Sequence, residues 1–273
     1  MDWLQALVLG VVQGLTEFLP ISSTAHLRIV PHYLGWGDPG IAFSAVIQLG
    51  TLFAVFIYFA SDVKMLTVAA FDGLRHRDFK RSPETLLAFS IAVGTLPIAV
   101  IGLSFKDFIE TEARGLQIIG SALIALAVVL MAAERLGKRR LDMQQLSFWQ
   151  IQCIGLCQAL ALIPGCSRSG STIMGGLLVG LKRAEAARFS FLLGLPAIGP
   201  SGLLEFLDLL EGGLGEEGLI NIGVGILAAA VSGYVSIGFL LRFLERYGTD
   251  VFSLYRIGLG GLILYGISTG STP

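Results

Sequence analysis

The chain is built from long apolar runs that alternate with short polar segments. A helix needs roughly 17 to 25 apolar residues to cross about 30 Å of hydrocarbon, and several runs are long enough. The pattern therefore predicts an all-α polytopic membrane protein with six transmembrane helices. The predicted spans cover residues 41–60, 84–104, 115–133, 189–206, 219–241 and 252–269.

Two further apolar segments, residues 3–34 and 148–181, are each interrupted by a proline, Pro20 in the first and Pro164 in the second. Proline breaks a helix because it lacks an N–H and clashes with the preceding turn. Basic residues flank 148–181 on both sides, and such residues stay on the cytoplasmic side of a membrane. We therefore expect 148–181, and by analogy 3–34, to enter the membrane and turn back as re-entrant helical hairpins.

The basic residues of the short polar segments predict the orientation of the spans. They cluster in 61–83 and 134–147, which we expect to be cytoplasmic loops, and they recur at Arg242 and Arg246. Segment 105–114 is mixed in charge, and we expect it outside. Counting spans from these loops places both the N-terminus and the C-terminus outside.

A weak internal repeat relates the two interrupted segments. Residues 9–14 can be aligned with 154–159, and residues 19–24 with 163–168. Because three full spans separate the two hairpins, the second copy should enter the membrane from the opposite face. We therefore predict one membrane domain that consists of two inverted-topology repeats. The domain covers residues 1–273, with repeat one at about 1–133 and repeat two at about 148–271.

The composition supports a membrane protein and excludes other classes. Hydrophobic residues make up 54% of the 273 residues and charged residues 14%, and the mean hydropathy is +0.76. Charged residues make up about 25% of an average globular protein, and a soluble helical protein would have to bury these runs on every face. The formal net charge is −1 and no basic stripe is visible, so we expect no nucleic-acid partner.

Polar side chains gather at the first interruption, although an unpartnered polar group in an apolar environment costs several kcal/mol. If residues 3–18 are helical, Gln13 and Glu17 lie one turn apart on one face, and a second short helix begins after Pro20. The free N–H groups of that second helix favour an anion, so the stretch is typical of a phosphate site. Its polar residues are Gln13, Thr16, Glu17, Ser22, Ser23, Thr24 and His26.

The second interruption adds a cation. Arg168 follows Pro164 at the start of a new helix. An arginine inside a membrane segment is costly and normally has a partner, so we expect Arg168 to bind a ligand. The alternatives are a structural ion pair with Glu17 and snorkelling to the surface. Together with backbone N–H groups, a guanidinium and several hydroxyls would hold a phosphate. The neighbouring hydroxyl residues are Ser167, Ser169, Ser171 and Thr172.

Glu17 and His26 are the candidates for acid–base chemistry. Glu17 is suited to be a general base, an orienter of His26 or a metal ligand; alternatively, it is a buried carboxylate held by Thr16 or Ser22. His26 lies three residues after Ser23, on the same helix face, and could take a proton from a serine nucleophile. A histidine that is merely packed is the alternative. Only one acidic side chain belongs to the cluster, which argues against a metal site built from two carboxylates.

The two interrupted stretches resemble the signature motifs of the undecaprenyl-diphosphate phosphatase family, also known as bacitracin-resistance proteins. The first motif is Q-G-x-T-E-F-L-P-x-S-S-T-x-H at residues 13–26, and the second is P-G-x-S-R-S-G-x-T at residues 164–172. The resemblance runs over nearly the whole chain, including residues 46–50 and 189–193. It implies a bacterial inner-membrane enzyme that removes the terminal phosphate of undecaprenyl diphosphate. Such an enzyme recycles the lipid carrier of cell-wall synthesis and confers bacitracin resistance.

The resemblance also implies an active site that opens to the periplasm and depends on a divalent cation, Mg²⁺ or Ca²⁺. Glu17 would be the essential acid, with the cation bridging its carboxylate and the substrate phosphates. Ser23 would be the nucleophile or a phosphate ligand, His26 its proton-transfer partner, and Arg168 the clamp on the diphosphate. The implied substrate-binding residues are Gln13, Ser22, Thr24, Ser167, Ser169 and Thr172.

Three positions depart from the family pattern. Gln13 stands where many members have a second glutamate, which weakens a metal mechanism that needs two carboxylates. Ser44 and Arg188 stand at positions that are often acidic in other members.

The residues leave some alternatives open. Metal-activated water could attack the phosphorus in place of Ser23. A lipid-phosphate or anion transporter would use the same inverted-repeat architecture, although a carrier needs no pair of nucleophile and base. A purely structural scaffold would leave Glu17 and Arg168 unexplained. The sequence does not decide between a monomer and a homo-oligomer.

Overall fold

The computed structural model describes residues 1–37, 39–105, 108–109, 111–211 and 216–270. Within these residues the regular secondary structure is helical, apart from one isolated bridge between Leu141 and Leu181. The α-helices are α1 Trp3–Phe18, α2 Ser23–Tyr33, α3 Ile41–Tyr58, α4 Ala60–His76, α5 Pro83–Ser104, α7 Leu116–Leu136, α8 Phe148–Ala159, α9 Arg168–Val179, α10 Arg183–Glu211, α11 Glu216–Arg246 and α12 Asp250–Ser268. Three short 3₁₀ helices, Glu112–Arg114, Met143–Gln145 and Leu160–Leu162, lie in connections.

Five of the described helices, α5, α7, α10, α11 and α12, are long and apolar enough to cross a membrane. The pair formed by α3 and α4 passes the same test but is bent by 84°. The prediction of an all-α polytopic membrane protein is therefore confirmed, with a sixth span if the bent pair is counted as one.

The prediction that residues 61–83 form a loop is wrong for most of that segment, because Ala60–His76 is helix α4. Its basic residues lie mainly at its C-terminal end, and apolar residues such as Phe71 occupy the body of the helix. Asp62 in the first turn pairs with Arg188 of α10, with 2.6 Å between oxygen and nitrogen. The helix ends at His76, and its C-cap Arg77 has a left-handed φ of 54°.

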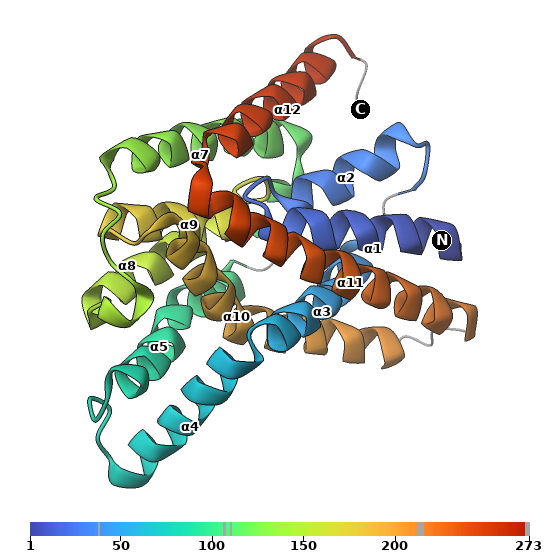
Figure 1. The fold of residues 1–273 in the computed structure, drawn as a ribbon. Coiled ribbons are helices and arrows are strands. Elements are labelled where there is room, and N and C mark those ends of the chain that lie inside the picture. Colours follow the sequence, from blue (N-terminus) through green and yellow to red (C-terminus); the bar gives the residue numbers. More distant parts are fainter. Residues whose placement is uncertain (38, 106–107, 110, 212–215, 271–273) are drawn as a thin grey trace.

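The two interrupted segments fold as pairs of short helices. Helix α1 ends at Phe18, just before Pro20, and α8 ends at Ala159 and is followed by a 3₁₀ turn before Pro164. Figure 1 shows α1 and α2 approaching the centre from the side of the N-terminus, and α8 and α9 from the opposite side.

Both ends of each helix pair lie together, as a re-entrant hairpin requires. Before α8, the backbone N–H of Leu141 donates to the carbonyl of Gly180, which follows α9 (2.9 Å). In the first pair, a cavity is lined both by Gln5 at the start of α1 and by Trp36 beyond the end of α2. This geometry matches the hairpins expected from the sequence.

The second helix of each hairpin begins at a serine in the same unusual conformation. Ser22 and Ser167 are the N-caps, with φ of 75° and 57°, a region that strains a residue with a side chain by about 1–3 kcal/mol. Their hydroxyls accept hydrogen bonds from the backbone N–H groups of Ala25 (3.4 Å) and Gly170 (3.1 Å). These caps align Ser22 with Ser167, one residue away from the register expected from the sequence, which placed Ser23 there.

Glycines allow the hairpin helices to pack closely against full-length helices. A Cβ on Gly14 of α1 would collide with the side chain of Ser232 and the backbone of α11. A Cβ on Gly155 of α8 would collide with the backbone of Gly94 in α5. The largest buried apolar cluster includes Phe18 from the first break and Cys166 from the second, so the hairpin tips lie in the core.

Far from the hairpin tips, a buried carboxylate joins three parts of the fold. Glu134 of α7 is 4% exposed. Its Oε1 accepts hydrogen bonds from Arg183 (2.6 Å) and Arg139 (2.8 Å), and its Oε2 accepts from the hydroxyl of Thr249 (2.9 Å). The cluster therefore ties the end of α7 to the start of α10 and to the turn before α12.

We expect Glu134→Ala to destabilise the protein by about 2 kcal/mol, because it leaves the arginines without their carboxylate. The value is at the low end for a broken ion pair, since the Arg183 and Arg139 side chains are 29% and 36% exposed. The melting temperature in detergent should fall by roughly 5 °C. Arg139→Gln, which spares the other contacts of Glu134, should cost less than half as much. Equal melting temperatures for wild type and Glu134→Ala would contradict this role.

Candidate functional site

The tips of the two hairpins meet at an ion pair. Nη2 of Arg168, the first residue of α9, lies 2.6 Å from Oε1 of Glu17, near the end of α1. The side chains are 16% and 6% exposed, so water screens this pair only weakly. The ion pair that the sequence left as an alternative for Arg168 is formed, and it joins one residue from each of the two predicted repeats.

The second carboxylate oxygen of Glu17 organises the rest of the cluster. Its Oε2 accepts hydrogen bonds from the hydroxyl of Ser23 (2.7 Å) and from Nε2 of Gln13 (2.9 Å). Thr16 and Ser22 do not hold Glu17, because the Thr16 hydroxyl donates to the carbonyl of Val12 and the Ser22 hydroxyl caps α2. Glu17 is thus a hydrogen-bond acceptor for Ser23 and a counter-ion for Arg168 at the same time.

A cavity of about 160 Å³ opens beside this cluster. Five residues expected from the sequence line it, and Gln48 and Ser201 are polar lining residues that the sequence analysis did not single out as site residues. The rest of the wall is apolar. The expected lining residues are Glu17, Ser23, Thr24, Ser167 and Arg168.

Several predicted binding residues serve the architecture of the tips instead of lining this cavity. The Ser169 hydroxyl donates to the carbonyl of Leu19 (3.2 Å), which links the two hairpins. The Thr172 hydroxyl donates to the carbonyl of Arg168 (2.8 Å) and also contacts the hydroxyl of Ser190. Ser22 and Gln13 are likewise absent from the wall, and the structure places both as supports: Ser22 caps α2, and Gln13 orients Glu17.

The sequence predicts a contact between His26 and Ser23, but His26 has other partners in the structure. Its Nδ1 is 2.7 Å from the carbonyl oxygen of Ser22, and its Nε2 is 2.7 Å from the hydroxyl oxygen of Tyr255 in α12, on which the ring also stacks. Both ring nitrogens are therefore engaged, and the expected Ser23–His26 pair is not formed. The reason is that the Ser23 hydroxyl turns towards Glu17, so the group placed to accept its proton is the carboxylate.

Arg256 of α12 is a residue of the hairpin junction that sequence reasoning missed. It is fully buried, and its guanidinium donates to the carbonyls of Pro20 (3.2 Å), Gly165 (2.9 Å) and Leu123 (3.2 Å). Its acceptors thus include backbone carbonyls at both breaks. The sequence contained one indication of this role, because Arg256 lies inside the predicted span 252–269 and an arginine within a membrane needs partners.

The two other positions that depart from the family pattern have local partners. Arg188 pairs with Asp62 of α4, and the Ser44 hydroxyl donates to the carbonyl of Gly40 (2.8 Å). Ser44 also lines a cavity of about 240 Å³ that shares Ser23 with the site cavity.

The oxygen ligands that the site offers fit a cation only if the substrate supplies most of the coordinating atoms. Within the described residues, no three His, Cys, Asp or Glu side chains form a group that could hold a metal ion. Glu17 is the single carboxylate of the cluster, and Oε1 of Gln13 is a buried oxygen without a hydrogen-bond partner in the described structure. Mg²⁺ is commonly held by one or two carboxylates together with substrate phosphates and water, which is compatible with Glu17 and Gln13.

Comparisons with known proteins agree over nearly the whole length of the chain. A family model described as bacitracin resistance protein BacA matches residues 6–262. A relative from Synechococcus sp. (strain JA-2-3B'a(2-13)), named undecaprenyl-diphosphatase, is 49% identical over 269 residues, which cover 98% of this chain and 95% of the relative. A relative of the same name from Myxococcus xanthus (strain DK1622) is 50% identical over 270 residues, which cover 99% and 91%. This chain therefore belongs to the bacitracin resistance protein BacA family.

Proposed function

We propose that this chain is an integral membrane phosphatase that hydrolyses undecaprenyl diphosphate to undecaprenyl phosphate and inorganic phosphate. The observation that carries the proposal is the 2.7 Å hydrogen bond from Ser23 to Glu17, opposite Arg168 in a cavity at the hairpin tips. The names of the relatives supply the substrate. The reaction recycles the lipid carrier of cell-wall synthesis and thereby confers resistance to bacitracin.

The described residues have distinct roles in this reaction. Arg168 and the hydroxyl of Ser167 hold the diphosphate in the cavity, and the free N–H groups at the start of α2 and α9 face its negative charge. Glu17 accepts the proton of Ser23 as the serine oxygen bonds to the terminal phosphorus. The bond from that phosphorus to the bridging oxygen breaks, and undecaprenyl phosphate leaves. Water then cleaves the phosphoserine, and inorganic phosphate is released.

His26 has a supporting role in this scheme. Its ring joins the backbone of Ser22 to the hydroxyl of Tyr255, so it fixes the start of α2 next to Ser23. Phosphoryl transfer depends mainly on positioning and charge stabilisation, and a misplaced Ser23 would slow it.

Ser23→Ala tests whether the serine is the nucleophile. We expect turnover to fall by about 10³-fold or more, because the acceptor of the phosphoryl group is lost. Phosphoserine at position 23 should be detectable in rapidly quenched wild-type protein. If Ser23→Ala keeps more than roughly a tenth of wild-type turnover, attack by water is favoured, with Glu17 as its base.

We also propose that a divalent cation, Mg²⁺ or Ca²⁺, binds together with the substrate at Glu17 and Gln13. When bound, the cation neutralises phosphate charge. Because the protein offers few ligands, the cation should bind weakly to the protein alone and tightly with the diphosphate. A chelator should then abolish turnover, and calorimetry should show no tight cation site without substrate. Full turnover in the presence of chelator would contradict this proposal.

We propose a bacterial inner-membrane location with the site open to the periplasm, and the distribution of charge supports this orientation. The start of α1 and the end of α12 lie towards one side of the molecule, whereas the ends of α4 and α7 lie towards the other side (Figure 1). Basic residues follow those helix ends at residues 75–81 and 135–140, which supports a cytoplasmic position there. The termini would then be periplasmic.

Phosphate release by the purified chain in detergent tests the function. Undecaprenyl diphosphate should be converted to undecaprenyl phosphate with one phosphate per lipid. Transport of the lipid without hydrolysis would favour the carrier alternative. The hydrogen bond from Ser23 to Glu17 gives that alternative no support, because a carrier needs no activated hydroxyl.

A further inference from the structure

Tyr255 of α12 reaches His26 from outside the first hairpin. Its hydroxyl oxygen lies 2.7 Å from Nε2 of His26, and the two rings stack with 5.7 Å between their centroids and 7° between their planes. On the other side of the imidazole, Nδ1 lies 2.7 Å from the carbonyl oxygen of Ser22. The imidazole therefore connects a long helix to the backbone carbonyl that precedes Ser23.

These two contacts determine which nitrogen of His26 carries the hydrogen. A carbonyl oxygen only accepts, so Nδ1 must donate to Ser22. In a neutral ring Nε2 is then an acceptor, and the Tyr255 hydroxyl donates to it. A neutral ring suits this position, because His26 is buried and the cation of Arg256 follows Tyr255 directly in α12. The hydroxyl of Tyr255 thus supports one tautomer of the histidine.

Consecutive residues of α12 hold the two sides of the first break. Arg256 donates to the carbonyl of Pro20 (3.2 Å), and Tyr255 reaches the carbonyl of Ser22 through the imidazole. Ser22 has a φ of 75°, and such a strained conformation persists only where its surroundings enforce it. Because Ser23 is the next residue, a change at Ser22 would move its hydroxyl away from the carboxylate to which it donates.

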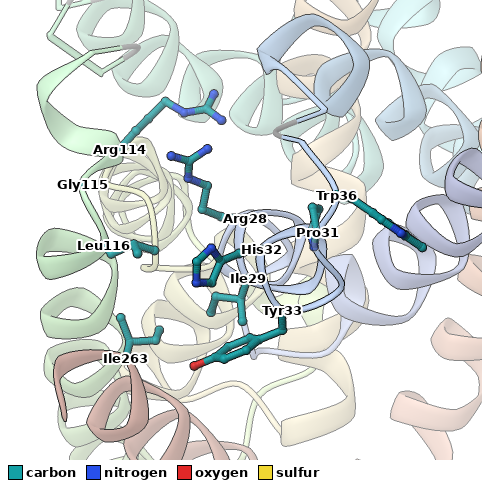
Figure 2. A pocket seen from close by; sticks show the side chains of 10 residues that line it. All are labelled: Arg28, Ile29, Pro31, His32, Tyr33, Trp36, Arg114, Gly115, Leu116 and Ile263. Carbon is teal, nitrogen blue, oxygen red and sulfur yellow. The ribbon is translucent and has the colours of Figure 1, made fainter. Parts of the chain in front are cut away.

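Apolar packing alone does not fix the orientation of α2. Its buried apolar side chains form a cluster with α7 and α12, and such contacts are non-directional. Figure 2 shows Ile29 of α2 and Ile263 of α12 at the wall of a cavity of about 340 Å³, so the packing of α2 is incomplete there. The bond to Tyr255 is directional and lies in the first turn of α2, so it can set the rotation of this helix about its axis. The buried members of the cluster are Ala25, Ile29, Ile119, Leu123 and Ile263.

We propose that Tyr255 is a positioning residue of the phosphatase site, which acts by donating a hydrogen bond to Nε2 of His26. This bond holds His26 as the neutral tautomer with its hydrogen on Nδ1, and His26 in turn holds the strained turn that presents Ser23 to the phosphate. The assignment rests on the proposed phosphatase function. Tyr255 is not among the residues that line the site cavity, so its effect passes through His26.

Tyr255→Phe removes the hydroxyl and keeps the stacked ring. We expect kcat for undecaprenyl diphosphate to fall about tenfold while KM changes less than about twofold, because the lost bond positions the reacting serine and does not bind the lipid. Tyr265→Phe removes a hydroxyl from an exposed tyrosine of the same helix and should leave kcat within about twofold of wild type. Wild-type kcat in folded Tyr255→Phe would overturn the proposal.

A double variant distinguishes action through His26 from a general contribution of Tyr255 to packing. His26→Ala should itself lower kcat, and adding Tyr255→Phe to it should lower kcat by less than about twofold further, because the bond is already absent. A further tenfold loss in the double variant would show that Tyr255 acts through other contacts, and this too would overturn the proposal.

Nuclear magnetic resonance of the full-length chain with ¹⁵N-labelled histidine, in detergent, tests the contact without turnover. The chain has three histidines, and His26→Ala identifies the signals of His26. In wild type, Nδ1 should be protonated and Nε2 unprotonated. In Tyr255→Phe the Nε2 signal should shift, whereas the signals of His32 and His76 should not.

The same spectra separate failure of this proposal from failure of the proposed function. A protonated Nε2 in wild type, or a His26 spectrum that Tyr255→Phe leaves unchanged, would overturn the role of Tyr255 even in an active phosphatase. The expected spectra in a wild-type protein that does not hydrolyse undecaprenyl diphosphate would contradict the proposed function and would confirm the contact between Tyr255 and His26.

Discussion

Arg168→Ala and Glu17→Ala should each lower phosphatase turnover by roughly 10³-fold while the protein still inserts and folds. Arg168 is the cation of the site cavity, and the phosphoryl transition state gains most of its stabilisation from such groups. Glu17 holds Arg168 by one oxygen and Ser23 by the other, so its loss removes both the proton acceptor and the orientation of the clamp. Initial rates with undecaprenyl diphosphate in detergent are the measurement.

Two controls separate chemistry from folding. Arg135→Ala changes an exposed arginine in the last turn of α7 and should leave turnover within about twofold of wild type. Arg168→Lys keeps the charge but loses the planar, two-pronged donor, so its turnover should lie between those of wild type and Arg168→Ala. Near-normal turnover in Arg168→Ala or Glu17→Ala would exclude the hairpin tips as the active site.

Arg256→Met should lower turnover by about 100-fold or more, although Arg256 is not among the residues that line the site cavity. The methionine fills similar volume but leaves the carbonyls of Pro20 and Gly165 without a donor in the core. The strained caps at Ser22 and Ser167 lie next to these carbonyls, so the tips should lose their fixed geometry. We expect kcat to fall more than KM rises, because the positions of Ser23 and Arg168 are disturbed.

The matched control for Arg256 lies on the preceding helix, α11. Arg242 of α11 bonds to the carbonyl of Gly238 on its own helix, and Arg242→Met should leave turnover nearly unchanged. Arg256→Lys should restore part of the activity, since an ammonium can reach some but not all of these carbonyls. If Arg256→Met folds with wild-type kcat, Arg256 does not position the site.

The sequence predicts the membrane fold well because apolar length is a strong signal. Five of the six predicted spans and the two breaks at Pro20 and Pro164 agree with the structure, since they depend on local features of the sequence. The predicted span 41–60 corresponds to α3, which is long and apolar enough only when it is counted together with α4. The prediction of a loop at residues 61–83 fails because it rests on basic residues alone. Basic residues occur both in loops and near the end of a helix such as α4, which follows a bend at Phe59.

The sequence predicts a site residue when its type is unusual for its surroundings. It does not predict the partner of a residue when contacts between distant parts of the chain determine that partner. Glu17 and Arg168 stand out as charges in apolar segments, and their contact follows from bringing the hairpins together. The partner of His26 could not be read from helix spacing, because the competing groups, Tyr255 and the backbone of Ser22, come from a distant helix and from the strained cap. The same applies to Arg256, whose acceptors lie in three separate parts of the chain.

The central claim is that Glu17 of one hairpin and Arg168 of the other act as one phosphatase site. The most direct measurement compares the rates of undecaprenyl diphosphate hydrolysis by wild type, Glu17→Gln, Arg168→Ala and the double variant. If the two residues act as a unit, the double variant should be no slower than the slower single variant, within about threefold. Losses that multiply in the double variant, or single variants that hydrolyse the lipid at the wild-type rate, would contradict a shared site.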